Sequence, residues 1–260
     1  MTTPTDTKSM AVFCDFENVA LGVREAKYAQ FDMRKVLERL LLKGSIVVKK
    51  AYCDWDRYKE FKAPMHEASF ELIEIPHVRM SGKNSADIRM VVDALDLCYT
   101  KSHVDTFVIV SGDSDFSPLV SKLRENAKTV IGVGVKNSSS DLLIANCDEF
   151  IYYDDLVRAE EQKRRAAKKR RDSAPAGEDK KQEAFELMLE TLNALVAERG
   201  EDERIWGSMV KQALKRRKPG FNESYYGFRA FSDLLEEAAA KGLVKLDPDE
   251  KSGGYLIRPA

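Results

Sequence analysis

The chain has 260 residues, of which 43% are hydrophobic and 33% are charged, and its formal net charge is −1 at pH 7. This composition is ordinary for a globular protein and leaves room for one medium and one small domain. It excludes a membrane-spanning helix, because no apolar run approaches the ~18 residues that such a helix needs.

The charge is unevenly distributed along the chain. Residues 1–157 carry 20 Lys and Arg against 24 Asp and Glu, whereas residues 158–183 carry 10 against 6. An acidic body followed by a basic connector does not fit a coat protein held on DNA by charge alone. It indicates local attraction for a polyanion.

The N-terminus and the cysteines bear on the cellular compartment. The first ten residues are polar, so we expect a frayed tail over 1–10 rather than a signal peptide. Four cysteines are scattered without a C-x-x-C pair, at Cys14, Cys53, Cys98 and Cys147. We therefore expect buried free thiols rather than a zinc site, and a cytoplasmic location.

Residues 11–157 alternate short apolar runs with amphipathic stretches. The pattern predicts strands at Ala11–Asp15, Ser45–Tyr52, Glu71–Val78, Thr106–Ser111, Lys128–Val135 and Asp148–Tyr152. It predicts helices at Met33–Lys43, Ser85–Tyr99 and Phe116–Asn126, with Ile88, Val91, Val92 and Leu95 on the apolar face of the second. This alternation indicates an α/β domain of three layers (α/β/α) with a central, mostly parallel sheet.

The pattern changes after residue 157. Residues 158–182 are rich in Lys and Arg and end in Ser, Ala, Pro and Gly, so we expect a linker. Residues 183–260 show helical patterns followed by two short strands around a polar turn. Helices followed by a two-stranded wing predict a small winged helix-turn-helix domain.

Acidic residues gather where the predicted strands end. Asp15 and Asn18 follow the first strand, Asp113 and Asp115 follow the fourth, and Asp87 lies in the first turn of the helix after Lys83. The carboxyl ends of parallel strands lie at one edge of a sheet, where ligands bind. Clustered carboxylates raise one another's pKa, and a hard cation such as Mg²⁺ or Mn²⁺ offsets that cost and supplies attacking water.

A simpler role for the same residues stays open. Asp, Asn and Ser after strands are routine helix caps, and Asp113 or Ser114 could cap the helix near Phe116. Asp141, which opens the next helix after Ser138–Ser140, is more typical of a cap than of a metal ligand.

Three segments resemble the motifs of the NYN domain, a branch of the PIN-like nucleases: VFCDFENVALG (Val12–Gly22), SADIRMVVDALDL (Ser85–Leu97) and the segment Val108–Gly134 with SGDSDF. The resemblance covers roughly residues 10–157, and we place the domain at 11–157. It implies a PIN-like fold and a Mg²⁺ or Mn²⁺ site that cleaves single-stranded RNA.

The resemblance also assigns roles to the acidic residues. It implies that Asp15, Asp87 and Asp113 are metal ligands, that Asp115 is a ligand or supports one, and that Asn18 orients water or phosphate. Asp93 matches the family pattern too. It lies six residues after Asp87, which at about 100° per residue puts the two on different helix faces. We therefore place Asp93, like Asp141, in a second tier.

Other residues near this edge could contact RNA. Phosphate contacts could come from Lys83 and Lys136, with hydrogen bonds from Ser81, Ser111 or Ser138. Aromatic residues after the second strand could stack on bases or pack in the core: Tyr52, Trp55 and Tyr58. The isolated histidines show no ligand spacing.

The segment Ile205–Leu246 resembles the OST-HTH/LOTUS domain, through a Trp, a basic turn, Pro-Gly-Phe-Asn, Tyr-Gly-Phe and Phe-x-x-Leu-Leu in order. The resemblance implies a winged-helix RNA-binding module over 183–260, with G-rich or structured RNA as a ligand, although some relatives dock a protein instead. Basic residues there could follow phosphates or complement a helix end: Lys211, Lys215, Arg216, Arg217 and Arg229.

Three functions compete on these observations. The first is a metal-dependent endoribonuclease that the LOTUS module directs to RNA. The second is a non-catalytic RNA-binding adaptor that keeps the fold. The third is a phosphatase with a nucleophilic Asp, which needs a second Asp where this chain has Glu17. We expect RNA and no membrane as partner; the oligomeric state stays open, with a dimer as one option.

Overall fold

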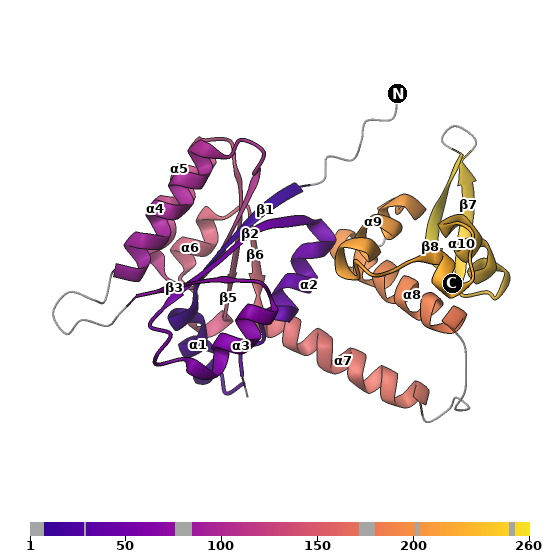
Figure 1. The fold of residues 1–260 in the computed structure, drawn as a ribbon, viewed down its shortest axis with the longest axis horizontal. Coiled ribbons are helices and arrows are strands. Elements are labelled where there is room, and N and C mark those ends of the chain that lie inside the picture. The colour runs from indigo at the N-terminus through magenta and orange to yellow at the C-terminus, as the bar shows by residue number, and fades with distance from the viewer. Residues whose placement is uncertain (1–7, 29, 76–84, 172–179, 201–202, 250–252) are drawn as a thin grey trace. The chain divides into compact units, whose positions relative to one another are not determined.

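The computed structural model describes residues 8–28, 30–75, 85–171, 180–200, 203–249 and 253–260 (Figure 1). Contacts divide the chain into two compact units, built mainly from residues 8–169 and from residues 170–260. The division falls within the segment 158–182, and the first part of that segment is helical. The predicted tail over 1–10 is wrong at its end, because the first strand already begins at Lys8.

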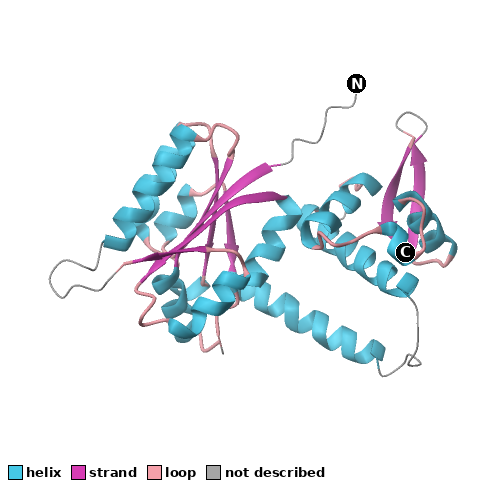
Figure 2. Cartoon of the chain, in the orientation of Figure 1, coloured by secondary structure: helices cyan, strands magenta, loops and turns pink. Residues whose placement is uncertain are grey.

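The first unit is a six-stranded sheet with helices on both faces, as Figure 2 shows. Its strand order is β3-β2-β1-β4-β5-β6, and the pairs β1–β4, β2–β3, β4–β5 and β5–β6 are parallel. The strands are β1 (Lys8–Asp15), β2 (Gly44–Cys53), β3 (Glu71–Glu74), β4 (Thr106–Val110), β5 (Thr129–Gly134) and β6 (Glu149–Tyr152). The α/β fold with a mostly parallel central sheet is therefore confirmed.

Helices connect these strands. Those before β4 are α1 (Phe16–Glu25), α2 (Met33–Lys43), α3 (Lys59–Glu67) and α4 (Ser85–Thr100). Those after β4 are η2 (Ser114–Phe116), α5 (Ser117–Glu125), η3 (Lys136–Ser138), α6 (Asp141–Asn146) and α7 (Tyr153–Arg171).

Alternate residues of the strands face two separate cores. On β1, Met10, Val12 and Cys14 pack with α1, α2 and α3, whereas Ala11 and Phe13 pack with α4, α5 and α6. This is the two-residue period of a strand that is buried on both faces. The consequence is a rigid sheet whose ends hold their flanking residues in fixed positions.

The strand order places a topological switch point at β1. The chain builds β1, β2 and β3 in one direction and then crosses to β4, β5 and β6 on the other side of β1. At such a switch point, the connections after the two adjacent strands leave in opposite directions and open a crevice at their carboxyl ends. Those ends are occupied by Asp15 and by the segment that begins at Ser111.

Helix α4 buries a different face from the predicted one. The fully or nearly fully buried residues are Met90, Ala94 and Cys98, whereas Ile88 is 63% exposed and Val92 is 56% exposed. The expectation for Ile88 and Val92 was therefore wrong. The helix carries apolar residues on more than one side, so periodicity alone does not select the side that meets the sheet.

The second unit consists of helices followed by a β-hairpin. Helices α8 (Lys180–Arg199), α9 (Gly207–Arg217) and α10 (Phe231–Ala240), with η4 (Glu223–Tyr226), precede the antiparallel strands β7 (Val244–Asp249) and β8 (Gly254–Pro259). An isolated antiparallel β-bridge pairs Trp206 with Leu256 of β8. This order is that of a winged helix. Its core contains Phe221, Tyr226, Phe228, Phe231, Leu234 and Leu235.

Two further expectations concern the described residues. None of their helices is long and apolar enough to cross a membrane. All four cysteines are free, and Cys14, Cys53 and Cys98 are buried, as expected for thiols that pack in a core.

The orientation of α4 can be tested by placing a charge on each face. Ala94→Asp buries a carboxylate without a partner and is expected to lower the free energy of unfolding by more than about 3 kcal/mol, whereas Val92→Asp should change it by about 0.5 kcal/mol or less. The measurement is urea unfolding followed by the fluorescence of Trp55 in a Trp206→Phe background. Equal losses from the two variants would contradict this orientation.

Candidate active site

The two strand ends at the crevice are joined by a buried hydrogen bond. Ser111 Oγ donates to Asp15 Oδ2 at 3.0 Å, although the two residues are 96 positions apart. Ser111 is fully buried and Asp15 is only 7% exposed. Asp15 is also the N-cap of α1, where its Oδ1 accepts from the Asn18 amide at 3.3 Å. The carboxylate of Asp15 is thus fixed from both sides.

Asn18 ties the first helix to the segment after β4. Its side-chain Oδ1 accepts a hydrogen bond from the Gly112 amide at 2.8 Å. The side-chain oxygen of Asn18 therefore orients the protein backbone, and its Nδ2 group is the donor that could contact a phosphate oxygen.

Ser111 and Asp113 continue this network. Ser111 Oγ accepts from the Asp113 amide at 3.2 Å, and Asp113 Oδ1 accepts from the Asp115 amide at 3.0 Å, which makes Asp113 the N-cap of η2. The expectation that Ser111 donates to phosphate was wrong, because its hydroxyl is buried and donates to Asp15. The alternative of helix capping holds for both Asp15 and Asp113, and capping leaves their carboxylates at the edge of the sheet.

A serine-rich segment after β5 closes one side of the crevice. The Ser140 amide donates to the Gly112 carbonyl at 2.9 Å. A Cβ atom added at Gly112 would lie 2.2 Å from the Ser138 carbonyl oxygen, so only glycine permits this close approach. The Gly112 position therefore sets the distance between the two segments.

The acidic side chains at the crevice affect one another's titration. Burial, followed by the negative charge of Asp87, raises the pKa of Asp15 to about 7, and Asp113 adds to the effect. Burial, followed by Asp113 and then Asp115, raises the pKa of Asp87 to about 6. These carboxylates belong to β1, α4 and the segment after β4, so charges from three separate segments act on the same edge of the sheet.

The donor set suits a hard divalent cation. Carboxylate oxygens are the ligands that Mg²⁺ and Mn²⁺ prefer, and a cation would reverse the rise in pKa of Asp15 and Asp87. Within the described residues, no three His, Cys, Asp or Glu side chains already stand close enough together to hold an ion. Coordination would therefore draw the side chains of Asp87 and Asp113 toward Asp15, whose carboxylate is held by Ser111 and Asn18.

Comparison with known protein families identifies this domain. The NYN domain matches residues 9–154, more than half of the chain. The chain belongs to the NYN domain family. The family indicates a nuclease-like function related to RNA.

Individual relatives share only parts of the chain. Meiosis regulator and mRNA stability factor 1 of Xenopus tropicalis is 27% identical over 148 residues, which are 57% of this chain and 9% of that protein. Uncharacterized protein MJ0482 of Methanocaldococcus jannaschii is 31% identical over 121 residues, 45% of each chain. The chain thus spans less than half the length of these two relatives.

The NYN domain also resembles a solved structure. The crystal structure of VPA0982 from Vibrio parahaemolyticus, a protein of unknown function, matches with a TM-score of 0.52 and 27% sequence identity. The match covers 60% of this chain and 98% of that one. It supports the fold assignment of the first unit.

The NYN domain places the second-tier acidic residues away from this network. Asp93 accepts hydrogen bonds from Tyr52 Oη at 2.8 Å and from Arg89 Nε at 3.1 Å, and it pairs with Lys50. These contacts pair Asp93 with Lys50 and Arg89 rather than with the acidic residues that follow β1 and β4. Asp141 is exposed in the first turn of α6, whose N-cap is Ser140.

The other residues expected to contact RNA near the NYN site differ in their exposure to solvent. Lys136 is exposed in η3, while Lys83 lies outside the described residues. The expectation that Tyr52 and Trp55 could stack on RNA bases is wrong, because both rings are buried. Trp55 Nε1 also donates a hydrogen bond to the Ile73 carbonyl. Tyr58 is partly exposed but packs against the ring of Phe16.

The basic residues of the second unit do not form one uniform patch. Arg217 is an internal partner: its side chain is 8% exposed, and it bonds to Glu190 at 2.9 Å and to Thr191 at 3.1 Å. Lys211 pairs with Glu223 at 3.0 Å. Arg216 is partly buried, and burial lowers its pKa. The exposed members are Lys215 and Arg229.

The raised pKa of Asp15 predicts a pH-dependent stability. In the absence of metal, the folded chain holds this proton more tightly than the unfolded chain, so stability falls as the pH rises from about 4 to about 7. Asp15→Asn removes this loss. Relative to wild type in EDTA, the variant should gain more than about 1.4 kcal/mol between pH 4 and pH 8, the equivalent of one pKa unit.

The measurement is urea unfolding across that pH range, with Asp96→Asn as the control because Asp96 is exposed on α4. The control should show no such pH-dependent gain. A gain for Asp15→Asn that did not change with pH would contradict the electrostatic coupling at the crevice.

Proposed function

We propose that the chain is a divalent-metal-dependent endoribonuclease that hydrolyses phosphodiester bonds in single-stranded RNA. The observation that carries the proposal is the approach of Asp15, Asp87 and Asp113 from three separate segments at the switch point: besides burial, Asp87 and Asp113 raise the pKa of Asp15, and Asp113 raises that of Asp87. A purely structural domain gains nothing from this arrangement, because uncompensated carboxylates in a crevice oppose folding. The family's nuclease-like character supports the same conclusion.

The residues divide into those that would hold the ion and those that position them. Asp15, Asp87 and Asp113 would hold Mg²⁺ or Mn²⁺, with Asp115 beside them. When bound, such an ion supplies an activated water and neutralises the developing charge on the phosphate oxygens. Ser111 and the Asn18 amide fix the Asp15 carboxylate, and Asn18 Oδ1 fixes the backbone that carries Asp113. Fixed ligands lower the cost of organising the transition state.

The second unit would select the RNA. Its order of helices and hairpin and its sequence motifs support a LOTUS-type winged helix, and Lys215 and Arg229 are the exposed cations among the candidates. A G-rich or structured RNA is the ligand class we propose, and a docked protein is the alternative. Connection to the catalytic domain would raise the local concentration of RNA near the crevice.

The nuclease proposal is tested by cleavage of a fluorescently labelled single-stranded RNA with Mg²⁺ or Mn²⁺. Asp87→Asn and Asp113→Asn each remove a proposed ligand and should lower the rate by at least about 100-fold. Asp96→Asn, on the same helix as Asp87 but exposed, is the matched control and should keep the wild-type rate.

The same assay separates the competing functions. An RNA-binding adaptor would bind the RNA without cleaving it, and a phosphatase would hydrolyse small phosphomonoesters instead. Cleavage that survives EDTA, or that Asp113→Asn leaves unchanged, would contradict the proposed metal site.

RNA binding by the second unit makes a separate prediction. Each cation that contacts a phosphate contributes about 0.7 to the slope of log affinity against log salt for a single strand. The double variant Lys215→Ala, Arg229→Ala should therefore reduce that slope by about 1.4 in fluorescence anisotropy titrations. The control is the double variant Lys8→Ala, Lys101→Ala, which removes two exposed lysines of the NYN domain. Lys8 is the first residue of β1, and Lys101 lies shortly before β4. Identical slopes for the two double variants would argue for a protein ligand at this unit.

A further inference from the structure

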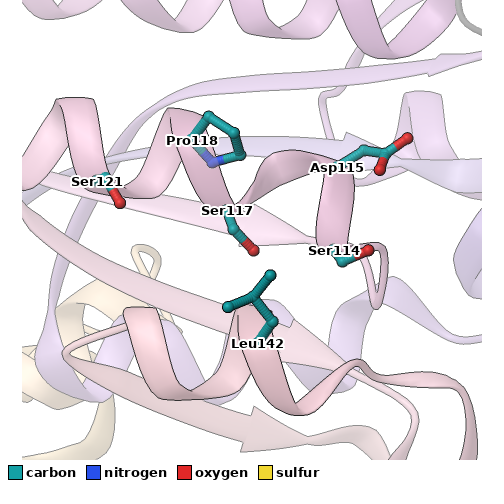
Figure 3. Close-up of a pocket in the computed structure, with 6 residues that line it drawn as sticks. All are labelled: Ser114, Asp115, Ser117, Pro118, Ser121 and Leu142. Atoms are coloured by element: carbon teal, nitrogen blue, oxygen red, sulfur yellow. The ribbon is translucent and has the colours of Figure 1, made fainter.

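An open pocket adjoins the acidic crevice on the side of α5 and α6. Its volume is about 470 Å³, and its lining residues are Ser114, Asp115, Ser117, Pro118, Ser121 and Leu142 (Figure 3). Ser114 and Asp115 directly follow Asp113, the proposed metal ligand, in η2. The pocket therefore begins next to the position that the scissile phosphate would occupy.

Ser117 gives this pocket an unmet hydrogen-bonding requirement. The residue is only 6% exposed, and its hydroxyl oxygen has no hydrogen-bond partner within the described structure. Leaving a buried hydroxyl unpaired costs about 1–3 kcal/mol. Figure 3 shows this hydroxyl directed between η2 and the side chain of Leu142, which is 57% exposed. If the exposed side chain of Leu142 moved aside, a ligand atom could reach the Ser117 hydroxyl.

The lining chemistry favours the neutral part of a nucleotide over its phosphate. Among the six lining residues, three are serines, two are apolar and one is the carboxylate of Asp115, with no cation. The lining itself therefore offers no positive side chain to a phosphate. Serine hydroxyls can both donate and accept, as the ribose 2′-hydroxyl does, and Leu142 and Pro118 offer apolar surface to a sugar or base.

We infer that this pocket binds the ribonucleoside attached to the scissile phosphate, with the Ser117 hydroxyl bonded to the ribose 2′-hydroxyl. The inference rests on the proposed nuclease function and adds a basis for choosing RNA over DNA. The phosphate lies over the carboxylates of the crevice, and the sugar beside it enters the pocket next to Ser114. A deoxyribose in the same position leaves the Ser117 hydroxyl unpaired.

The test compares Ser117→Ala with wild type in the full chain. The variant should fold at least as stably, because it removes an unpaired buried hydroxyl. In cleavage of a uridine hexanucleotide with Mn²⁺, the loss of one hydrogen bond should raise KM about five-fold, with kcat changed less than two-fold. The preference for this RNA over deoxyuridine hexanucleotide should fall by a similar factor. Ser102→Ala, at an exposed turn before β4, is the matched control and should change neither.

A second measurement reads the pocket without turnover. In the Asp113→Asn variant with Mg²⁺, the uridine hexanucleotide should shift the methyl NMR signals of Leu142 more than the deoxyuridine hexanucleotide does. Failure of wild type to cleave RNA would count against the nuclease function alone, since these shifts do not depend on cleavage. Unshifted Leu142 signals, or a Ser117→Ala enzyme with an unchanged preference for RNA, would overturn the inference.

Discussion

The hydrogen bond between Ser111 and Asp15 is the interaction on which the candidate site depends. It joins the carboxyl ends of β1 and β4, which are neighbours in the sheet but 96 residues apart in the chain. Two buried cores hold these strands, so the ends have little freedom to separate. Asn18 adds a second link through the Gly112 amide. These links fix the orientation of the Asp15 carboxylate and of the backbone that leads to Asp113.

The same edge carries an electrostatic cost that indicates its use. Burial and like charge raise the pKa of Asp15 to about 7 and that of Asp87 to about 6. Asp93 shows the contrasting case, since Tyr52 and Arg89 satisfy its carboxylate. Asp87 and Asp93 of α4 both match the family-like pattern, yet Asp87 lies near Asp113 and Asp115, whereas Asp93 pairs with Lys50 and Arg89. Unbalanced charge in a crevice is typical of a site that works with a cation.

Much of the fold and part of the site could be predicted from the sequence. Strand β1 and helix α2 lie close to their predicted bounds because their apolar periods are local and clear. The placement of Asp15 and Asp113 at strand ends followed from the same patterns. The roles of Ser111, Tyr52 and Arg217 could not be predicted, because each is decided by a partner distant in the chain.

By itself, the sequence determined the α/β alternation, the acidic residues at the strand ends and the NYN-like motifs, since each of these features depends on residues close together in the chain. The tertiary structure alone decided which side of α4 is buried. Met90 and Ala94 meet the sheet while Ile88 and Val92 stay exposed, because the sheet accepts only one face of a helix that is apolar on several. It also decided that Ser117 lies beside Leu142 at a pocket, since these residues belong to α5 and α6, which are separated in the chain by β5 and meet only in the folded sheet.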